Sequence, residues 1–402
     1  MKIKKSMKIT FITNYLTHHQ LPFAEEMYRR LGKEFCFIAT NRMEEERIRM
    51  GWELDDRQYP YVLFYDDAMQ QCERLVMDSD IVICGGTHEL YIRKRLVAGK
   101  ITFRYFERLY KKGQWRAFAP AGYLKNRRKH TANKDKPVYL LCAGAYVPSD
   151  FHLLGAYPEK MLKWGYFPVF LPHDTEQLMN GKGDVCRILW TGRMIHWKHA
   201  EDAVRAIERL LQKNPQREDF HLTMVGEGEC APKIREMIEH KTIAGRRLSE
   251  LITMQSFIKP KEVRSLMEQS SIYLMTSDYE EGWGAVVNEA MNSGCAVIAS
   301  HGAGSVPYLI RHGENGLVYK SGHVKELAGQ IEELIASPSK RKQLGEAAYH
   351  TIAGSWNPAA AAERMLHFCE VLLQGKYQPE KEGPLSSAEL IAPEKGYRYC
   401  HR

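Results

Sequence analysis

The chain alternates short apolar runs with amphipathic helical stretches, and this alternation constrains its fold more than any other feature. Apolar runs of this length, bounded by turn residues and separated by helices, are typical of a parallel sheet that is covered on both faces. A doubly wound α/β fold is therefore predicted. The strands expected in the first half of the chain are Lys8–Asn14, Phe35–Thr40, Ile81–Cys84, Ile101–Phe106 and Val138–Cys142.

A second alternating series begins at Cys186, after a stretch with few helical signals. That stretch, Gly165–Asp184, contains two prolines and is predicted to be a linker. Two α/β domains joined in this way form a cleft, and sheets of this kind bind ligands outside the carboxyl ends of their strands. The strands expected in the second series are Cys186–Gly192, Phe220–Gly226, Leu251–Phe257, Ile272–Ser277, Ala296–Ser300 and Gly316–Tyr319.

The two series define the predicted domains. We expect Rossmann-like domains at residues 1–170 and 186–356, joined by a linker at 171–185. A further helix is predicted at 357–374. The tail at 375–402 is polar with scattered prolines, and we expect it to be partly disordered.

Composition excludes several classes of protein. Of 402 residues, 44% are hydrophobic and 26% are charged, which is near the average of soluble globular chains and unlike disordered or collagenous ones. The longest near-apolar run, Val138–Val147, is shorter than the roughly 20 residues of a membrane-spanning helix. The N-terminus has no signal-peptide pattern, and the nine scattered cysteines include no CxxC pair. We therefore expect a cytoplasmic protein with free thiols and no zinc site.

The positive charge is concentrated in one segment. Residues 91–136 contain fifteen Lys or Arg and only two acidic residues, a net charge of +13, whereas the whole chain carries +8. Such a segment attracts phosphate-bearing partners, such as an anionic membrane, a lipid diphosphate or a nucleic acid. A solvated basic surface without a partner is the alternative. Neither an RNA- nor a DNA-binding motif accompanies the charge, so we expect no nucleic acid.

The stretch Thr276–Ser300 combines a strand, an acidic glycine-rich turn and a helix. Gly282 and Gly284 allow a ligand to approach the backbone, and a helix beginning near Gly284 would present free N–H groups to a phosphate. Glu281 lies in the turn. Glu289 lies about one and a half turns into the helix, where its carboxylate can accept hydrogen bonds from two neighbouring hydroxyls, such as those of a ribose.

A second group of residues follows the first strand of the second series. Arg193 comes directly after Gly192, and Lys198 lies five residues further on, at the start of the next helix. Both cations are expected at the carboxyl end of a strand, facing the same cleft. Arg provides a planar fork for phosphate oxygens and Lys a compact charge, and together they would stabilise the charge that develops on a departing diphosphate.

These motifs resemble those of GT-B glycosyltransferases, and in particular the large retaining family 4, or group 1, of bacterial surface-polysaccharide enzymes. The resemblance covers about residues 186–373. Two segments depart from the family pattern: Tyr308 replaces a common glutamate in the loop at 303–310, and Lys259 replaces a common glycine. The matching elements are the Glu281-x7-Glu289 pair, the Arg193 and Lys198 element, VGEGE at 225–229 and RHGENGLVY at 311–319.

The resemblance implies a GT-B fold, two Rossmann-like domains facing a cleft, with the C-terminal helix crossing back to the first domain. The donor would be a UDP- or GDP-sugar, with no metal required. Arg193 and Lys198 would bind its diphosphate, Glu289 its ribose, and Glu281 the transferred sugar together with the backbone of Gly282, Trp283 and Gly284. Gly192 would allow close approach, and Phe257 and Ile258 would lie beside the base.

Candidate residues in the first domain follow its strands. His19, His88 and Glu107 are each predicted just beyond the carboxyl end of a strand, where they could bind the donor sugar or orient an acceptor hydroxyl. A single structural hydrogen bond is the alternative role for each. This half of the chain has no Gly-x-Gly loop after its first strand, which argues against a dehydrogenase.

The function expected from the resemblance is transfer of a hexosyl or N-acetylhexosaminyl group to a glycan or polyprenyl-diphosphate-linked acceptor, with retention. It would serve capsule, exopolysaccharide or lipopolysaccharide synthesis in the cytoplasm, at the inner face of the plasma membrane if the segment 91–136 docks there. The alternatives are another GT-B activity, such as a nucleotide-sugar epimerase or an inverting transferase, and a non-catalytic GT-B partner subunit.

Overall fold

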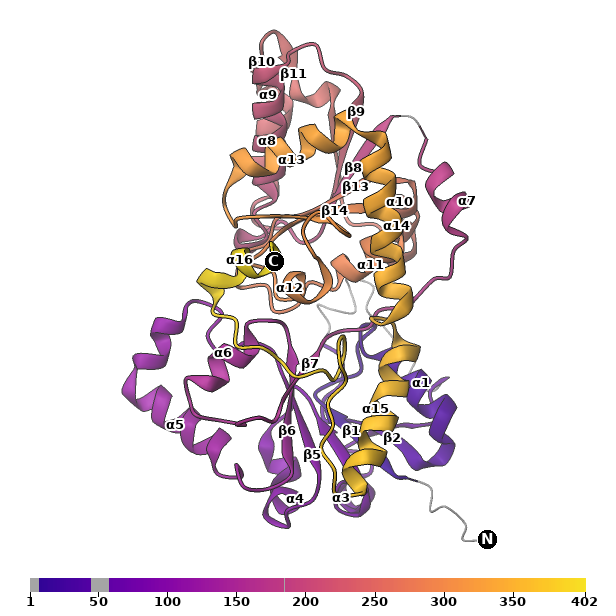
Figure 1. The fold of residues 1–402 in the computed structure, drawn as a ribbon, viewed down its shortest axis with the longest axis vertical. Helices are drawn as coiled ribbons and strands as arrows, with labels where there is room; N and C mark the ends of the chain where they lie inside the picture. Colours follow the sequence, from indigo (N-terminus) through magenta and orange to yellow (C-terminus); the bar gives the residue numbers. More distant parts are fainter. Residues whose placement is uncertain (1–6, 45–57, 184) are drawn as a thin grey trace. The chain divides into compact units, whose positions relative to one another are not determined.

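The computed structural model describes residues 7–44, 58–183 and 185–402, which form two compact units (Figure 1). Unit 1 comprises residues 1–169 and 355–390, and unit 2 comprises residues 170–354 and 391–402. Each unit contains its own sheet. None of the helices in the described ranges is both long and apolar enough to cross a bilayer.

Unit 1 is built on a seven-stranded sheet with the order β3-β2-β1-β4-β5-β6-β7, in which these strands pair in parallel. All residues of β1, β4 and β6 are buried, which explains their continuous apolar runs. Its strands are β1 Ile9–Thr13, β2 Phe35–Ala39, β3 Val62–Phe64, β4 Ile81–Cys84, β5 Thr102–Phe106, β6 Val138–Ala143 and β7 Met161–Trp164.

The helices of unit 1 come from both ends of its sequence. Its 3-10 helices are η1 Gly32–Glu34, η4 Glu89–Ile92 and η5 Gln114–Phe118. Its α-helices are α1 Leu21–Leu31, α3 Met69–Asp78, α4 Arg93–Val97, α5 Pro120–Thr131, α6 Val147–His152 and α15 Pro358–Leu373. The late helix α15 packs against α1 (Figure 1), and Arg30 Nη2 donates to the carbonyl oxygen of Ala359 at 3.3 Å.

Unit 2 contains a six-stranded sheet with the order β12-β9-β8-β13-β14-β15, again with parallel pairings. In sequence order this is 3-2-1-4-5-6, the arrangement of a Rossmann fold. The strands are β8 Cys186–Thr191, β9 Phe220–Val225, β12 Ile252–Gln255, β13 Ile272–Met275, β14 Ala296–Ser300 and β15 Leu317–Tyr319. A small hairpin consists of β10 Thr242–Ile243 and β11 Arg246–Arg247.

Helices flank this sheet, and α8 and α13 pack against each other with one buried face each. The stretch expected to be a linker contains a short helix, α7. The α-helices are α7 Thr175–Asn180, α8 Ala200–Lys213, α9 Ala231–His240, α10 Pro260–Gln269, α11 Val286–Asn292, α12 Val306–Leu309, α13 Val324–Ala336, α14 Pro338–Gly354 and α16 Gly396–Cys400. The 3-10 helices are η6 His196–Lys198, η7 Leu248–Glu250 and η8 Pro393–Lys395.

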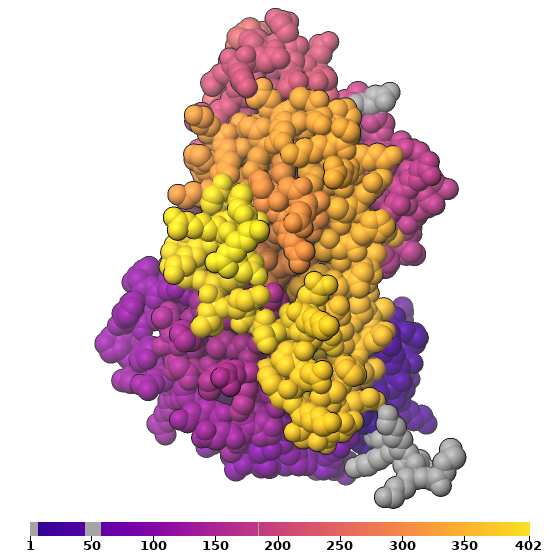
Figure 2. All heavy atoms as spheres, in the orientation of Figure 1, coloured from indigo at the N-terminus to yellow at the C-terminus, as the bar shows by residue number. Residues whose placement is uncertain are grey.

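The residues beyond Gly375 are ordered by specific partners, contrary to the disorder that their composition predicts. In unit 1, Leu385 is fully buried, and its N–H donates to the carbonyl oxygen of Lys163 in β7 at 2.8 Å. In unit 2, Tyr397 donates to Glu326 Oε1 at 2.6 Å. Figure 2 shows these residues, in yellow, packed on the surface. A few apolar anchors in a polar segment are sufficient to order it.

Candidate functional site

Most of the predicted site residues lie at one edge of the sheet of unit 2. The strand order places β8 beside β13, and the direction in which successive strands are added to the sheet reverses there, so the loops after these two parallel strands flank the topological switch point. Arg193 and Lys198 follow β8, and Glu281 follows β13. Phe257 follows β12, two strands away. The sequence prediction that these side chains share one edge is therefore realised by the topology.

The side chains of Lys198 and Glu281 form an ion pair across this switch point. Lys198 Nζ donates to Glu281 Oε2, which also accepts from Ser277 Oγ at 3.2 Å. The side chains of Lys198 and Glu281 are only 16% and 15% exposed, so water screens the pair weakly. The pair places a cation for an anionic ligand next to a carboxylate that can accept from sugar hydroxyls.

Backbone contacts hold the two loops together around this pair. The N–H of Asp278 donates to the carbonyl oxygen of Trp197 at 3.0 Å, and Thr276 Oγ1 donates to that of Lys198 at 2.6 Å. Trp190 Nε1 in turn donates to Thr276 Oγ1 at 2.8 Å. The backbone of Lys198 is thus held by the residue that follows the neighbouring strand β13. This lowers the conformational entropy that the loop would lose on binding a ligand.

His199 connects the same two loops through its side chain. It adopts a left-handed conformation with φ 46°, and its Nε2 lies 3.0 Å from Asp278 Oδ2. The hydrogen bond to Asp278 raises the pKa of His199, and burial opposes this effect. Sequence reasoning missed this residue because nothing in its spacing distinguishes it from a loop histidine.

A pH dependence of stability follows from the raised pKa of His199. The folded protein binds a proton more tightly than the unfolded chain, so the stabilisation is present below the unfolded pKa of about 6.5 and is lost as pH rises through the folded value. We compare the unfolding midpoint of the wild type with that of His199→Asn at each pH. The excess of the wild-type midpoint is expected to decrease as the pH is raised from about 6 to about 8. Asparagine tolerates the left-handed conformation. A midpoint difference that does not change with pH would contradict the assignment.

Glycines allow the loops after β8, β9 and β13 to approach closely. A Cβ atom on Gly226 would lie 1.8 Å from the carbonyl oxygen of Gly192, and one on Gly228 would lie 2.5 Å from that of Met194. Gly284 has φ +88°, and a Cβ there would meet Met275 Cε at 2.7 Å. Gly226, Gly228 and Gly284 are therefore required first for loop packing within unit 2.

Glu289 lies in the first turn of α11, because this helix begins at Val286, two residues later than predicted. Its carboxylate accepts no hydrogen bond from the part of the chain that the structure describes. Burial raises the pKa of Glu289, and the charge of Arg264 on α10 opposes this. Arg264 carries no motif and was missed by sequence reasoning, yet it anchors to Asn292 Oδ1 at 2.6 Å beside Glu289.

The remaining predicted residues of unit 2 differ in exposure. Arg193 is exposed, with its guanidinium 5.8 Å from the ring centre of Trp197, and Phe257 is 49% exposed. Ile258 and Gly192 are half-buried, whereas Gly282 is buried. The indole of Trp283 is buried and donates from Nε1 to Asn288 Oδ1 at 2.9 Å, so this side chain packs in the interior.

In unit 1, two of the three candidates follow the strands of its own switch point, β1 and β4. The ring of His19 lies 5.8 Å from that of Tyr166. His88 accepts from the N–H of Leu90 at its Nδ1, at 3.1 Å, and so caps η4. This hydrogen bond gives His88 a structural role, which was the alternative to ligand binding in the sequence analysis.

Glu107 follows β5 and has two partners within unit 1. It accepts from Tyr166 Oη at 2.9 Å and from Lys111 Nζ at 2.5 Å. The side chain of its neighbour Arg108 is buried and pairs with the fully buried Asp150 at 3.2 Å. Glu107 therefore keeps a partly exposed carboxylate, while Arg108 stabilises the fold.

The basic segment 91–136 does not form one charged surface. Arg95 is fully buried and donates to four carbonyl oxygens around it. Arg104, 2% exposed, pairs with Glu89 at 2.7 Å, and Arg108 is buried as described above. The sequence therefore overstates the exposed charge of this segment, because three arginines satisfy backbone or carboxylate groups in the interior.

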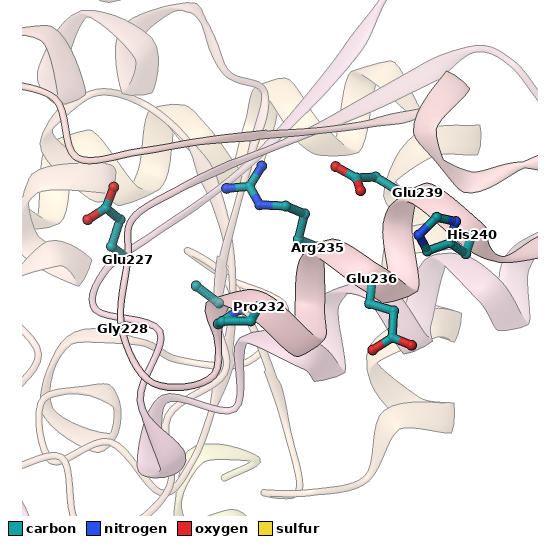
Figure 3. Close-up of a pocket in the computed structure, with 8 residues that line it drawn as sticks. Glu227, Gly228, Pro232, Arg235, Glu236, Glu239 and His240 are labelled. Carbon is teal, nitrogen blue, oxygen red and sulfur yellow. The ribbon is translucent and has the colours of Figure 1, made fainter.

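A pocket of about 440 Å³ lies along α9 in unit 2 (Figure 3). Its eight lining residues all belong to the loop after β9 or to α9, and none is a predicted site residue. Figure 3 shows Glu227, Arg235 and Glu239 extending on one side of α9, with Glu236 on the other. Among the described residues, no three His, Cys, Asp or Glu side chains are grouped as metal ligands.

Comparisons with known proteins match unit 2 most clearly. Residues 180–351 match the family model of glycosyl transferases group 1. The spore coat protein SA of Bacillus subtilis is 24% identical over 46% of this chain and 48% of its own length. The D-inositol 3-phosphate glycosyltransferase of Streptomyces bingchenggensis is 29% identical over 43% of this chain and 38% of its own. The chain thus spans less than half of the length of these two relatives.

The fold of the whole chain is similar to that of a solved structure. The crystal structure of Anabaena HepE in complex with UDP matches with a TM-score of 0.65 at 14% identity, covering 92% of this chain and 100% of HepE. Two Rossmann-like units with parallel sheets, together with this match, establish the architecture. The chain has the GT-B fold, and the greater part of its unit 2 matches the glycosyl transferases of group 1.

Proposed function

We propose that this protein is a glycosyltransferase that moves a sugar from a nucleoside-diphosphate donor to a hydroxyl acceptor. The observation that carries the proposal is the set of charged residues at the switch point of unit 2, where Lys198 and Glu281 pair between neighbouring loops. The motif matches in this unit and the likeness of the fold to HepE, which was solved with UDP, support the donor class.

Each residue of the site has a role in the proposed reaction. Arg193 and Lys198 bind the donor diphosphate, and Glu289, whose carboxylate accepts no hydrogen bond within the described chain, accepts from the ribose hydroxyls. Glu281 and the backbone of the following turn hold the transferred sugar. The bond between the anomeric carbon and the diphosphate breaks, the acceptor oxygen bonds to that carbon, and its proton passes to the departing phosphate. We propose that the anomeric configuration is retained and that no metal takes part.

The finer parts of the proposal concern the sugar, the acceptor and the place of the reaction. We propose transfer of a hexosyl or N-acetylhexosaminyl group to a glycan or a polyprenyl-diphosphate-linked acceptor, in the synthesis of a bacterial surface polysaccharide. The reaction takes place in the cytoplasm, at the inner face of the membrane. His19, His88 and Glu107, at the strand ends of unit 1, are the candidates for contact with the acceptor or the donor sugar.

Thermal stabilisation tests the donor class. We expect one nucleoside diphosphate, either UDP or GDP, and its sugars to raise the unfolding midpoint, with or without a chelator. Glu289→Ala is expected to reduce that stabilisation by weakening donor affinity, through loss of charge-assisted hydrogen bonds worth about 1.5–3 kcal/mol. The control is Glu239→Ala, which changes an exposed carboxylate on α9.

Two outcomes would contradict the proposal. If no nucleotide stabilises the protein, the chain is a non-catalytic GT-B partner rather than a transferase. If a nucleotide-sugar binds and is converted without any acceptor, an epimerase is the better assignment. Analysis of the product by NMR separates retention from inversion at the anomeric carbon.

A further inference from the structure

Unit 1 exposes three large apolar side chains in one short stretch of chain. Trp115 and Phe118 of η5 are 67% and 80% exposed, and Leu124 of α5 is 61% exposed. Residues three apart lie on the same side of a 3-10 helix, which has three residues per turn, so Trp115 and Phe118 share one face. Leu124 belongs to α5, the next helix along the chain, which contacts η5. We call these three residues the apolar ridge.

The ridge is held in place by the fold. Gly113 has φ +115°, and a Cβ atom there would lie 2.6 Å from Trp115 Cδ1, so the indole rests against backbone that only glycine leaves open. Gln114 donates from Nε2 to Ser149 Oγ at 2.8 Å and to the buried Asp150 Oδ1 at 2.9 Å. The exposed aromatic pair is therefore held on a helix that is anchored to the interior of unit 1.

Cations that form no ion pair among the described residues lie just before and within η5 and α5, the helices that carry the ridge. Between Arg108 and Lys134 the sequence contains no Asp or Glu. The guanidinium of Arg116 lies 5.3 Å from the ring centre of Trp115. Five cations are exposed and, within the described ranges of the chain, form no ion pair with a carboxylate: Lys112, Arg116, Lys125, Arg127 and Arg128.

The combination of exposed apolar and cationic side chains favours an anionic lipid surface over a nucleic acid as the partner. Anionic lipid headgroups attract Lys and Arg, while Trp and Phe gain by entering the boundary between headgroups and acyl chains. A single-stranded nucleic acid would gain from stacking on Trp115 and Phe118, but the aliphatic Leu124 offers no ring on which a base can stack. Burial in hydrocarbon favours all three residues of the ridge.

We propose that the apolar ridge, with the cations at 112–128, docks unit 1 on an anionic lipid bilayer. This inference deepens the proposed function, because a lipid-linked acceptor lies in such a bilayer, but its evidence lies in unit 1 alone. It also narrows the contact from the whole basic segment 91–136 to η5 and α5. The bilayer supplies both the negative charge and the apolar layer that this surface matches.

Vesicle binding by the full chain tests the proposal. The probes are vesicles of phosphatidylcholine alone and vesicles in which about 30% is phosphatidylglycerol, an anionic lipid. We expect binding to the anionic vesicles only, weakened by salt. Trp115→Ser with Phe118→Ser is expected to lower the affinity at least about tenfold. Lys125→Gln, Arg127→Gln and Arg128→Gln together are expected to lower it by on the order of 100-fold.

Matched controls lie at residues 90–97 and at 134, in or next to the basic segment and outside η5 and α5. Leu90→Ser with Val97→Ser removes two side chains that are 65% and 71% exposed, and Arg93→Gln, Lys94→Gln and Lys134→Gln remove three exposed charges. Both controls are expected to bind anionic vesicles within about threefold of the wild type. Unchanged unfolding midpoints establish that each variant is folded.

A soluble polyanion separates docking on a bilayer from simple charge attraction. The Trp115→Ser and Phe118→Ser variant should bind heparin as the wild type does while losing vesicle affinity. Equal vesicle affinity of this variant and the wild type would overturn the proposal, as would an equal loss for heparin and vesicles, which indicates a nucleic-acid or other polyanion site. Nucleotide stabilisation is measured in parallel, so failure of the proposed function is seen independently of vesicle binding.

Discussion

Lys198→Ala is expected to lower kcat by about 10²–10³-fold while changing donor affinity much less. In the proposed reaction, negative charge grows on the diphosphate as its bond to the sugar breaks. A cation fixed at the switch point stabilises that charge more in the transition state than in the ground state, and loss of one such electrostatic group has effects of this size. The measurement is kcat and KM with the donor identified by thermal stabilisation.

Two further variants make the result specific to the charge of Lys198. Lys198→Arg keeps the cation and should retain more activity than the alanine variant. Arg205→Ala, on the exposed side of α8, removes a nearby cation that pairs with Asp202 outside the site, and should leave kcat unchanged. If Lys198→Ala raises KM alone, the residue acts in uniform donor binding and its assignment to the leaving group is wrong.

Asp150→Asn is expected to destabilise unit 1 by about 3–5 kcal/mol, because it leaves a buried arginine without its counter-charge. The Asp150 carboxylate is fully buried and accepts from Arg108 Nη2 at 3.2 Å, from the N–H of Tyr110 at 3.0 Å and from Gln114 Nε2 at 2.9 Å. The change is a large share of the 5–15 kcal/mol that stabilises a typical domain. Native-state hydrogen exchange of the β6 amides, which lie in unit 1, measures it.

An exposed ion pair of the same unit provides the control. Asp67 pairs with Arg42 at 2.7 Å, a shorter distance than in the buried pair, but both side chains are about 60% exposed. Solvent screening limits such pairs to about 0–1 kcal/mol, so Asp67→Asn should hardly change the exchange rates. Equal effects of the two substitutions would contradict the argument that burial, and not distance, sets the contribution of these pairs.

The fold of unit 2 and much of its site could be predicted from local sequence patterns. Periodicity predicted all six strands of its main sheet but not α9, α12 or the β10–β11 hairpin. Motifs that follow strands in a parallel sheet must lie at one edge. The pairing of His199 with Asp278 and the position of Arg264 could not be predicted. They depend on which loops become neighbours and on side-chain orientation, neither of which leaves a periodic signal.

The basic segment 91–136 shows more clearly that the position of individual side chains could not be predicted from sequence patterns. Its charge was read correctly from composition, but Arg95 and Arg104 lie in the interior because carbonyl and carboxylate groups there require donors. The tail was expected to be partly disordered because of its average polarity, whereas single residues such as Leu385 anchor it. Composition averages over a segment, and burial is decided residue by residue.

The chain passes from one unit to the other three times, after residues 169, 354 and 390. During synthesis, therefore, the amino-terminal 169 residues leave the ribosome long before α15, which packs on α1, has been made. Unit 1 cannot complete its packing until almost the whole chain has emerged. Neither unit corresponds to an uninterrupted gene fragment, so an expression library of simple truncations would leave at least one of them without a piece of its structure.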